Sequence, residues 1–158
     1  MKKLHYVLLG LLFLFNQNTF SQELEFGFQA SLPSYGLSLK ANLNETHSAQ
    51  VIYGALGIVS TLSGRYIYSF NETNDRFPLV PFVYAQVGSW TYDFAAADIN
   101  ESVFGYGFGA GIEFSLGDWI SDRLSTTIEL GYGKVDLESY DFKATSFGFG
   151  IHYKFIDL

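Results

Sequence analysis

Residues Val103–Phe114 read VFGYGFGAGIEF, which is the clearest structural pattern in the chain. Apolar and aromatic residues take every second position, and glycine takes most positions between them. Successive side chains of a β-strand point to opposite faces, so this period of two predicts a strand with one bulky and one small face. The bulky face holds Phe104, Tyr106, Phe108, Ala110, Ile112 and Phe114.

The same alternation recurs along the rest of the chain, for example over 24–32, 37–43, 124–132 and 147–155. Clusters of Gly, Pro, Asn and Asp separate these runs and predict turns. The position of the third hairpin within 57–64 and the inward face of the fifth strand stay open. The predicted strands are 23–32, 35–43, 47–57, 60–70, 79–94, 102–116, 123–137 and 142–156.

The composition restricts the class of protein. The chain has 158 residues, of which 48% are hydrophobic, 18% aromatic and 16% charged. Its length fits one domain, and its aromatic content excludes intrinsic disorder. The absence of cysteine excludes a disulfide scaffold, a cysteine-bound metal and a thiol nucleophile. A net charge of −7 argues against nucleic acid as a partner, because phosphate binding needs a basic face.

Residues 1–21 have the pattern of a secretory signal peptide. Lys2 and Lys3 precede an apolar stretch over 4–15, and small residues follow at Thr19 and Ser21. This apolar stretch is too short for a membrane-spanning helix, which needs about 20 residues. We therefore expect cleavage before Gln22, and a single β-barrel domain over 22–158.

The bulky face of the strands is predicted to point outward. The interior of a closed eight-stranded barrel is just wide enough for side chains, so it suits glycine, serine and single charged groups. An outward apolar band is costly in water but suits a lipid bilayer. Aromatic residues near the strand ends are then candidates for interfacial girdles: Tyr35, Tyr66, Tyr68, Phe70, Trp90, Tyr92, Phe94, Trp119, Tyr132, Tyr140, Tyr153 and Phe155.

Val103–Phe114 and Ser125–Tyr132 (STTIELGY) resemble late strands of the small outer-membrane barrels of Gram-negative bacteria, the family of the OmpA transmembrane domain and OmpX. The closing strand also resembles that family's assembly signal, although this chain ends Ile156-Asp157-Leu158 rather than on an aromatic residue. The signal fits either Ser146, Gly148, Ile151 and Tyr153 or Gly150, Tyr153 and Phe155.

The resemblance implies an all-β fold, namely an eight-stranded antiparallel up-and-down transmembrane β-barrel over 22–158. It implies the outer membrane as location, with both chain termini in the periplasm. The implied partners are outer-membrane lipid and, during biogenesis, the barrel assembly machinery. The implied oligomeric state is a monomer, and no cofactor is implied.

Charged residues on the inward faces predict an ion-pair network in the lumen, because a buried charge without a partner is costly. We expect Glu25, near the start of the first strand, to approach His152 and Lys154 on the last strand, since these two strands must pair to close the barrel. The predicted lumenal polar network is Glu25, Lys40, Arg65, Glu113, Glu129, His152 and Lys154.

We expect a structural or surface-exposed role, with a lumen filled by polar side chains and no catalytic activity. One alternative is a narrow gated pore or small-ligand site in the same lumen. Another is a soluble lipocalin-like carrier of a small apolar ligand. The Gly88-Ser89-Trp90 segment resembles the lipocalin Gly-x-Trp signature, although it lies in the middle of the chain.

Residues for catalysis or metal binding are sparse. A lipid A deacylase needs a histidine and a serine close together near the outer leaflet, with a carboxylate that orients the histidine. The candidate His47-Ser48 is predicted in a turn on the periplasmic side. Asp93, Asp98 and Glu101 near the loop over 95–101, the longest predicted on the outer face, are interpreted as solvated charge rather than a Ca²⁺ site.

Overall fold

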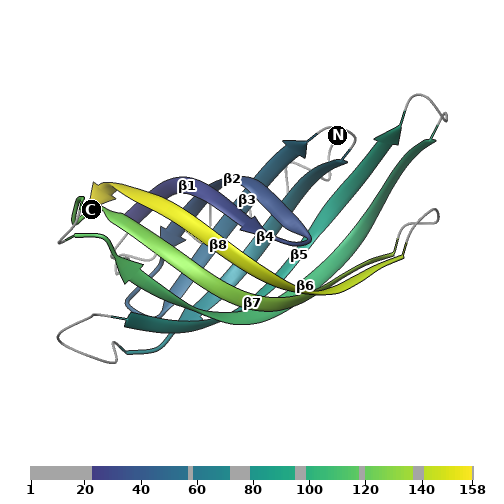
Figure 1. Ribbon diagram of the computed structural model, residues 1–158. Coiled ribbons are helices and arrows are strands. Elements are labelled where there is room, and N and C mark those ends of the chain that lie inside the picture. The colour runs from purple at the N-terminus through teal and green to yellow at the C-terminus, as the bar shows by residue number, and fades with distance from the viewer. Residues whose placement is uncertain are drawn as a thin grey trace, which may run out of the picture.

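The computed structural model describes residues 23–56, 59–71, 79–94, 99–117, 120–136 and 141–157. Within these residues, eight antiparallel strands follow one another around a closed barrel, and the last strand pairs with the first (Figure 1). This arrangement confirms the predicted fold class. The strands are β1 (Glu23–Ser31), β2 (Ser34–Asn42), β3 (His47–Leu56), β4 (Val59–Ser69), β5 (Leu79–Phe94), β6 (Ile99–Ser115), β7 (Leu124–Asp136) and β8 (Asp141–Asp157).

The observed strands lie close to the predicted ones, and β5 agrees at both ends. The largest difference concerns β6, which begins at Ile99 and pairs there with Phe94, so the connection predicted over 95–101 is shorter. Leu56 pairs with Val59, which places the third hairpin at 57–58. The signal peptide predicted over 1–21 and Asp98 lie outside the described residues. In the part of the chain that the structure describes, no helix is long and apolar enough to cross a bilayer.

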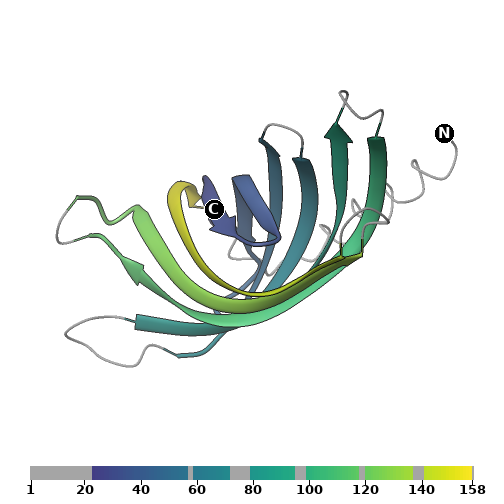
Figure 2. The ribbon, with the colours of Figure 1, turned by 45° about the vertical axis from the view of Figure 1, so that its right-hand side comes forward.

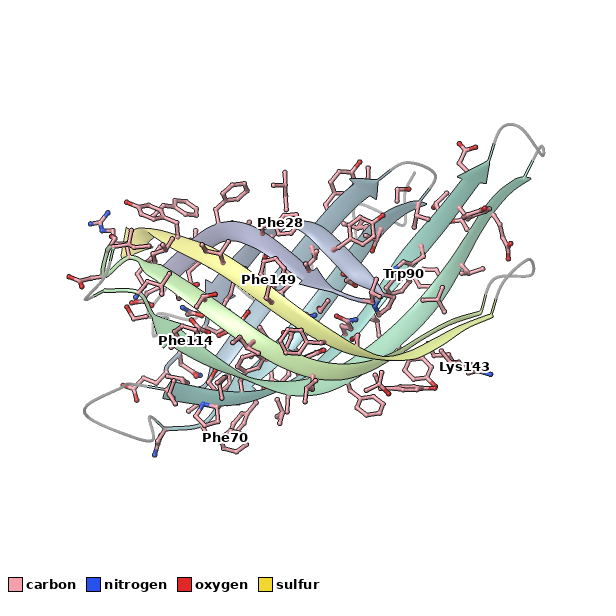
Figure 3. All side chains as sticks on the ribbon, in the orientation of Figure 1. Phe28, Phe70, Trp90, Phe114, Lys143 and Phe149 are labelled. Carbon is pink, nitrogen blue, oxygen red and sulfur yellow. The ribbon has the colours of Figure 1, made fainter. Side chains whose placement is uncertain are left out.

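The bulky face of the sheet points outward, as predicted. Phe108 is 55% exposed, Phe149 is 50% exposed and Ile151 is 40% exposed, and the rings of Phe28 and Phe149 lie side by side on β1 and β8 (Figure 3). The inward face carries buried polar residues of five strands, β1, β2, β4, β7 and β8, namely Glu25, Gln29, Lys40, Arg65, Glu129 and His152. The aromatic surface therefore surrounds an interior that contains many buried polar side chains.

The inward face of β5 carries Phe82, Tyr84, Gln86 and Trp90, all of them buried. The prediction that Trp90 belongs to an interfacial girdle is wrong, because its indole is 3% exposed and donates from Nε1 to the carbonyl oxygen of Pro33 at 2.8 Å. Both faces of β5 are apolar, so its alternation alone does not reveal which face is inward. Pairing with the glycine-rich inward face of β6 leaves room for these large side chains inside.

The barrel wall has uneven height. β1 and β2 have 9 residues each, whereas β5 has 16 and β6 has 17. We call the end with Glu23 and Asp157 the terminal end, and the opposite end the distal end. β8 begins at Asp141 but pairs with β1 only from Phe149 onward. At the distal end, β5, β6, β7 and β8 therefore continue past the turn between β1 and β2 (Figures 1 and 2).

Candidate functional site

The candidate site is the polar lumen, which most of the strands help to build. Because side chains alternate between the two faces of a strand, every second residue points inward. Pairing in register brings the inward residues of neighbouring strands to the same height. Large inward side chains on β5 face glycines on β6 and β7. A Cβ atom added at Gly131 would lie 2.2 Å from Oη of Tyr84, so a larger residue there would have to displace this ring.

A first cluster centres on the ion pair between Arg65 of β4 and Glu129 of β7. Nη1 of Arg65 lies 2.9 Å and 3.1 Å from the two carboxylate oxygens, and both side chains are 1% exposed. Nη2 donates to Oγ of Ser31 and to Oε1 of Gln86, both at 2.8 Å. The guanidinium also lies 4.0 Å from the ring centroid of Tyr84. This arginine therefore has partners on several strands, which stabilise its buried charge.

A second cluster, nearer the terminal end, centres on Lys40 of β2. Its Nζ lies 2.7 Å from Oε2 of Glu113 on β6 and 3.4 Å from Oε1 of Glu25 on β1. Glu25 also accepts a hydrogen bond of 2.6 Å from Nδ2 of Asn42 and one of 3.4 Å from Oγ of Ser125. One ammonium group thus links two carboxylates from different parts of the wall.

The two remaining predicted residues lie near this second cluster but have other partners. Lys154 opposes Glu25 in the backbone register, yet its Nζ lies 2.8 Å from Glu23 in a partly exposed pair. Glu25 also opposes Lys40 of β2, and that lysine points into the lumen and takes the carboxylate. His152 forms hydrogen bonds rather than an ion pair, with Oγ of Ser38 at 2.9 Å and Nε2 of Gln50 at 3.2 Å.

Little space remains between the two clusters. A void of about 10 Å³ is bordered by residues of both, and this volume holds about one water molecule. A larger cavity of about 310 Å³ lies at the terminal end, where Glu23, Glu25, Glu113 and Lys154 help to line it. Glu113 borders both spaces, so the ion pair between Lys40 and Glu113 stands between them. The middle of the lumen is filled by side chains.

Several lumenal residues were not singled out from the sequence. Gln86 accepts hydrogen bonds from Arg65, and Gln50 donates to Gln29 and to Ser38. Tyr84 packs with Ile67 and Phe82 in a small apolar cluster. Gln29 occupies an inward position of the alternation over 24–32, so the period of two already placed it, whereas Gln86 shares β5 with the aromatic residues. The aromatic residues occupy the strand whose inward face the alternation left open.

The other candidates lie outside the lumen. His47 is the first residue of β3 rather than a turn residue, and its ring contacts those of Tyr66 and Tyr68. Asp93 is exposed near the distal end of β5, and Glu101 lies on β6 with a partner. Among the described residues, no group of three or more His, Asp or Glu side chains is placed to hold a metal ion.

The geometry defines a class of protein, a closed antiparallel β-barrel with an apolar outer wall and a charged, side-chain-filled interior. Lipid suits such an outer wall. The chain belongs to the family of the outer membrane protein beta-barrel domain, whose model matches residues 12–155. It is therefore an outer-membrane barrel protein, which confirms the resemblance noted in its late strands. Membership in this family argues against the soluble lipocalin-like carrier.

Two solved structures share the fold of this chain. The N-terminal β-barrel domain of Pseudomonas aeruginosa OprF matches with a TM-score of 0.59 and 17% identity, covering 88% of this chain and all 100% of that one. Neisserial surface protein A (NspA) matches with a TM-score of 0.53 and 14% identity, covering 85% of this chain and 94% of that one. At these identities the likeness extends to the fold alone. A search of curated proteins finds no match.

Proposed function

We propose that this protein is a structural or surface-exposed component of the outer membrane, with a lumen that neither conducts ions nor catalyses a reaction. The observation that carries this proposal is the cluster around Arg65 and Glu129, which joins β4 and β7 across the interior. These strands are not neighbours in the barrel, so their ion pair crosses the lumen. An ion on its way through would have to separate two charges that are almost completely buried.

The absence of catalysis is proposed from the surroundings of the lumenal histidine. Ser38 and His152 are within hydrogen-bonding distance, as a nucleophile and its base must be. Both side chains are buried, however, and Nδ1 of His152 has no hydrogen-bond partner among the described residues. A carboxylate that orients the histidine is therefore missing there, and an acyl chain in the bilayer cannot reach the serine.

The partners are proposed from the surface. The exposed aromatic and aliphatic wall suits outer-membrane lipid, and closure between β1 and β8 is the step that the assembly machinery would complete. A barrel that satisfies its own strand edges needs no second copy for stability, which supports a monomer.

Conductance in planar bilayers tests the proposal. The wild-type barrel is expected to be silent, because the Arg65–Glu129 pair and the residues around it fill the lumen. The Glu129→Ala variant removes one side of that pair and is also expected to be silent, since Gln86, Tyr84 and Lys40 remain. Discrete channels in the wild type would refute the filled lumen, and channels in Glu129→Ala alone would favour the gated pore.

Lipid A mass spectra test the absence of lipid chemistry. Cells that produce the wild-type barrel and cells that lack its gene are expected to give the same spectrum. The Ser38→Ala variant serves as a control, because it removes the hydroxyl beside His152 and leaves the outer wall unchanged. A change in acylation that depends on Ser38 would refute the proposal.

A further inference from the structure

The turn between β1 and β2 lies inside the distal mouth of the barrel. Pro33 and Ser34 are buried, although they belong to a turn at the end of a hairpin. β5 lies on the opposite side of the barrel from β1 in the strand order. Even so, Nε1 of Trp90 on β5 donates to the carbonyl oxygen of Pro33 at 2.8 Å, and Figure 3 places Trp90 beside the hairpin tip. This hydrogen bond therefore spans the lumen.

Two more strands hold the same turn. Oγ of Ser146 on β8 donates to the carbonyl oxygen of Leu32 at 2.9 Å. Nη2 of Arg65 on β4 donates to Oγ of Ser31, the last residue of β1, at 2.8 Å. Backbone carbonyl groups at a buried turn need such donors, because an unpaired buried acceptor is costly. The turn is thus fixed to β4, β5 and β8.

Glycines in the opposite wall make room for this contact. A Cβ atom added at Gly133 of β7 would lie 2.3 Å from Cδ of Pro33, and one added at Gly105 of β6 would lie 2.9 Å from Cζ3 of Trp90. Real Cβ atoms do not approach other atoms so closely, so alanine at Gly133 must displace the turn. Gly64, on the exposed face of β4, has nothing within 4 Å of an added Cβ and offers a matched control.

We propose that the β1–β2 turn is a stopper in the distal mouth, held in place by Trp90, and that solutes enter the lumen from the terminal end. The short first hairpin brings Pro33 to the height of Trp90, while the neighbouring hairpins continue outward around it. The 310 Å³ cavity lies at the terminal end, below the Lys40 cluster. Beyond the filled middle of the lumen, the distal mouth is thus closed by a single turn.

A single introduced cysteine can report on the stopper, because the chain has none of its own. Ser63 of β4 is buried just below Trp90, and its hydroxyl has no hydrogen-bond partner among the described residues, so Ser63→Cys is a mild change. From the terminal end it is shielded by Arg65 and Glu129. Ser102→Cys, on the exposed face of β6, is the accessible reference. The probe is a small charged methanethiosulfonate, applied to the barrel purified in detergent.

We expect the cysteine at position 63 to react far more slowly than the one at 102. Adding Gly133→Ala or Trp90→Ala should accelerate its reaction about tenfold or more, which corresponds to about 1.4 kcal/mol in the opening equilibrium. Adding Gly64→Ala should leave the rate unchanged. The shift in gel mobility on heating shows in each case that the barrel is folded.

Equal rates at positions 63 and 102 in the otherwise unchanged barrel would overturn the proposal. So would folded Gly133→Ala and Trp90→Ala barrels that react no faster than their parent. If Trp90→Ala fails to fold, Trp90→Phe takes its place, because it keeps an aromatic ring while it removes the donor to Pro33 and part of the ring volume. An unchanged rate in both Trp90→Phe and Gly133→Ala would equally refute a stopper held by Trp90.

Discussion

At the scale of single residues, the lumen shows how charges tolerate burial in a barrel. Arg65 is surrounded by one carboxylate, two neutral oxygen acceptors and an aromatic ring, so each side of its planar guanidinium has a partner. Lysine could not match this arrangement, because its ammonium lacks the planar fork of donors. Lys40 instead sits between two carboxylates, where a compact charge suffices.

Removing Glu129 is predicted to cost much more than removing the whole ion pair. Glu129→Ala leaves the buried charge of Arg65 without its counter-ion, and breaking a buried pair in this way costs about 3–5 kcal/mol. The double variant Arg65→Met, Glu129→Leu removes both charges and should be far more stable. Urea unfolding in lipid vesicles, followed by tryptophan fluorescence, gives the free energies of unfolding. Equal losses in the single and double variants would contradict this account.

The partly exposed pair between Lys154 and Glu23 is predicted to contribute little. Its side chains are 30% and 33% exposed, and exposed ion pairs are worth about 0–1 kcal/mol. Lys154→Ala should therefore reduce the free energy of unfolding by less than about 1 kcal/mol. Lys40→Ala is the comparison, because it removes the ammonium group that Glu25 and Glu113 share in the lumen. A larger loss for Lys154→Ala than for Lys40→Ala would contradict the assignment of these partners.

At the scale of strands, the period of two explains most of what the sequence could predict. In β6, glycine alternates with large residues, so both the strand and its outward face followed from Val103–Phe114. In β5, the adjacent residues Val83 and Tyr84 are both largely apolar, so their sequence does not show which one points inward. The pairing with β6 places Tyr84 inside. Alternation shows which residues of a strand share a face. When both faces are similarly apolar, it does not show which of them points outward.

Partner choice within the lumen was harder to predict for a related reason. Glu25 has a lysine opposite it on each neighbouring strand, Lys40 on β2 and Lys154 on β8. From the closure of the barrel we predicted the contact between Glu25 and Lys154. In the structure Glu25 pairs with Lys40 instead, and Lys154 pairs with Glu23. The contact between Trp90 and Pro33 could not be predicted from the sequence either, because it depends on the height at which the short first hairpin ends.

A charged residue on the outward face of a strand is predicted to destabilise the barrel according to its depth. Leu130 lies midway along β7 and is exposed to the outside. An arginine near the bilayer midplane of such a barrel costs about 2–4 kcal/mol, falling to about 0–1 kcal/mol near the interface. Leu130→Arg should therefore cost more than Ser102→Arg, near the distal end of β6. Urea unfolding in vesicles measures both, and equal costs would contradict the outward band.

For the molecule as a whole, closure of the barrel is what allows its strands to lie in a membrane. An open sheet of these strands would have two edges. In hydrocarbon, an exposed edge leaves backbone N–H and C=O groups unpaired. The pairing of β1 with β8, from Ala30 with Phe149 to Glu23 with Asp157, removes the last two edges. The same pairing places His152 of β8 within hydrogen-bonding distance of Ser38 on β2, so this lumenal contact depends on the closure of the barrel.

A chain that ends at Gly148 is therefore predicted not to accumulate in the outer membrane, although it keeps most of its strands. It lacks every β8 residue that pairs with β1, and the edges of β1 and of part of β7 would meet hydrocarbon unpaired. A chain that ends at Asp157 is the matched control, because it keeps the whole of β8. Membrane fractionation with gel mobility before and after heating distinguishes them: the control should shift on heating, and the shorter chain should be absent or unshifted. A heat-shifted band from the shorter chain would mean that the other strands close without β8, and the dependence of the lumen on the β1–β8 seam would have to be abandoned.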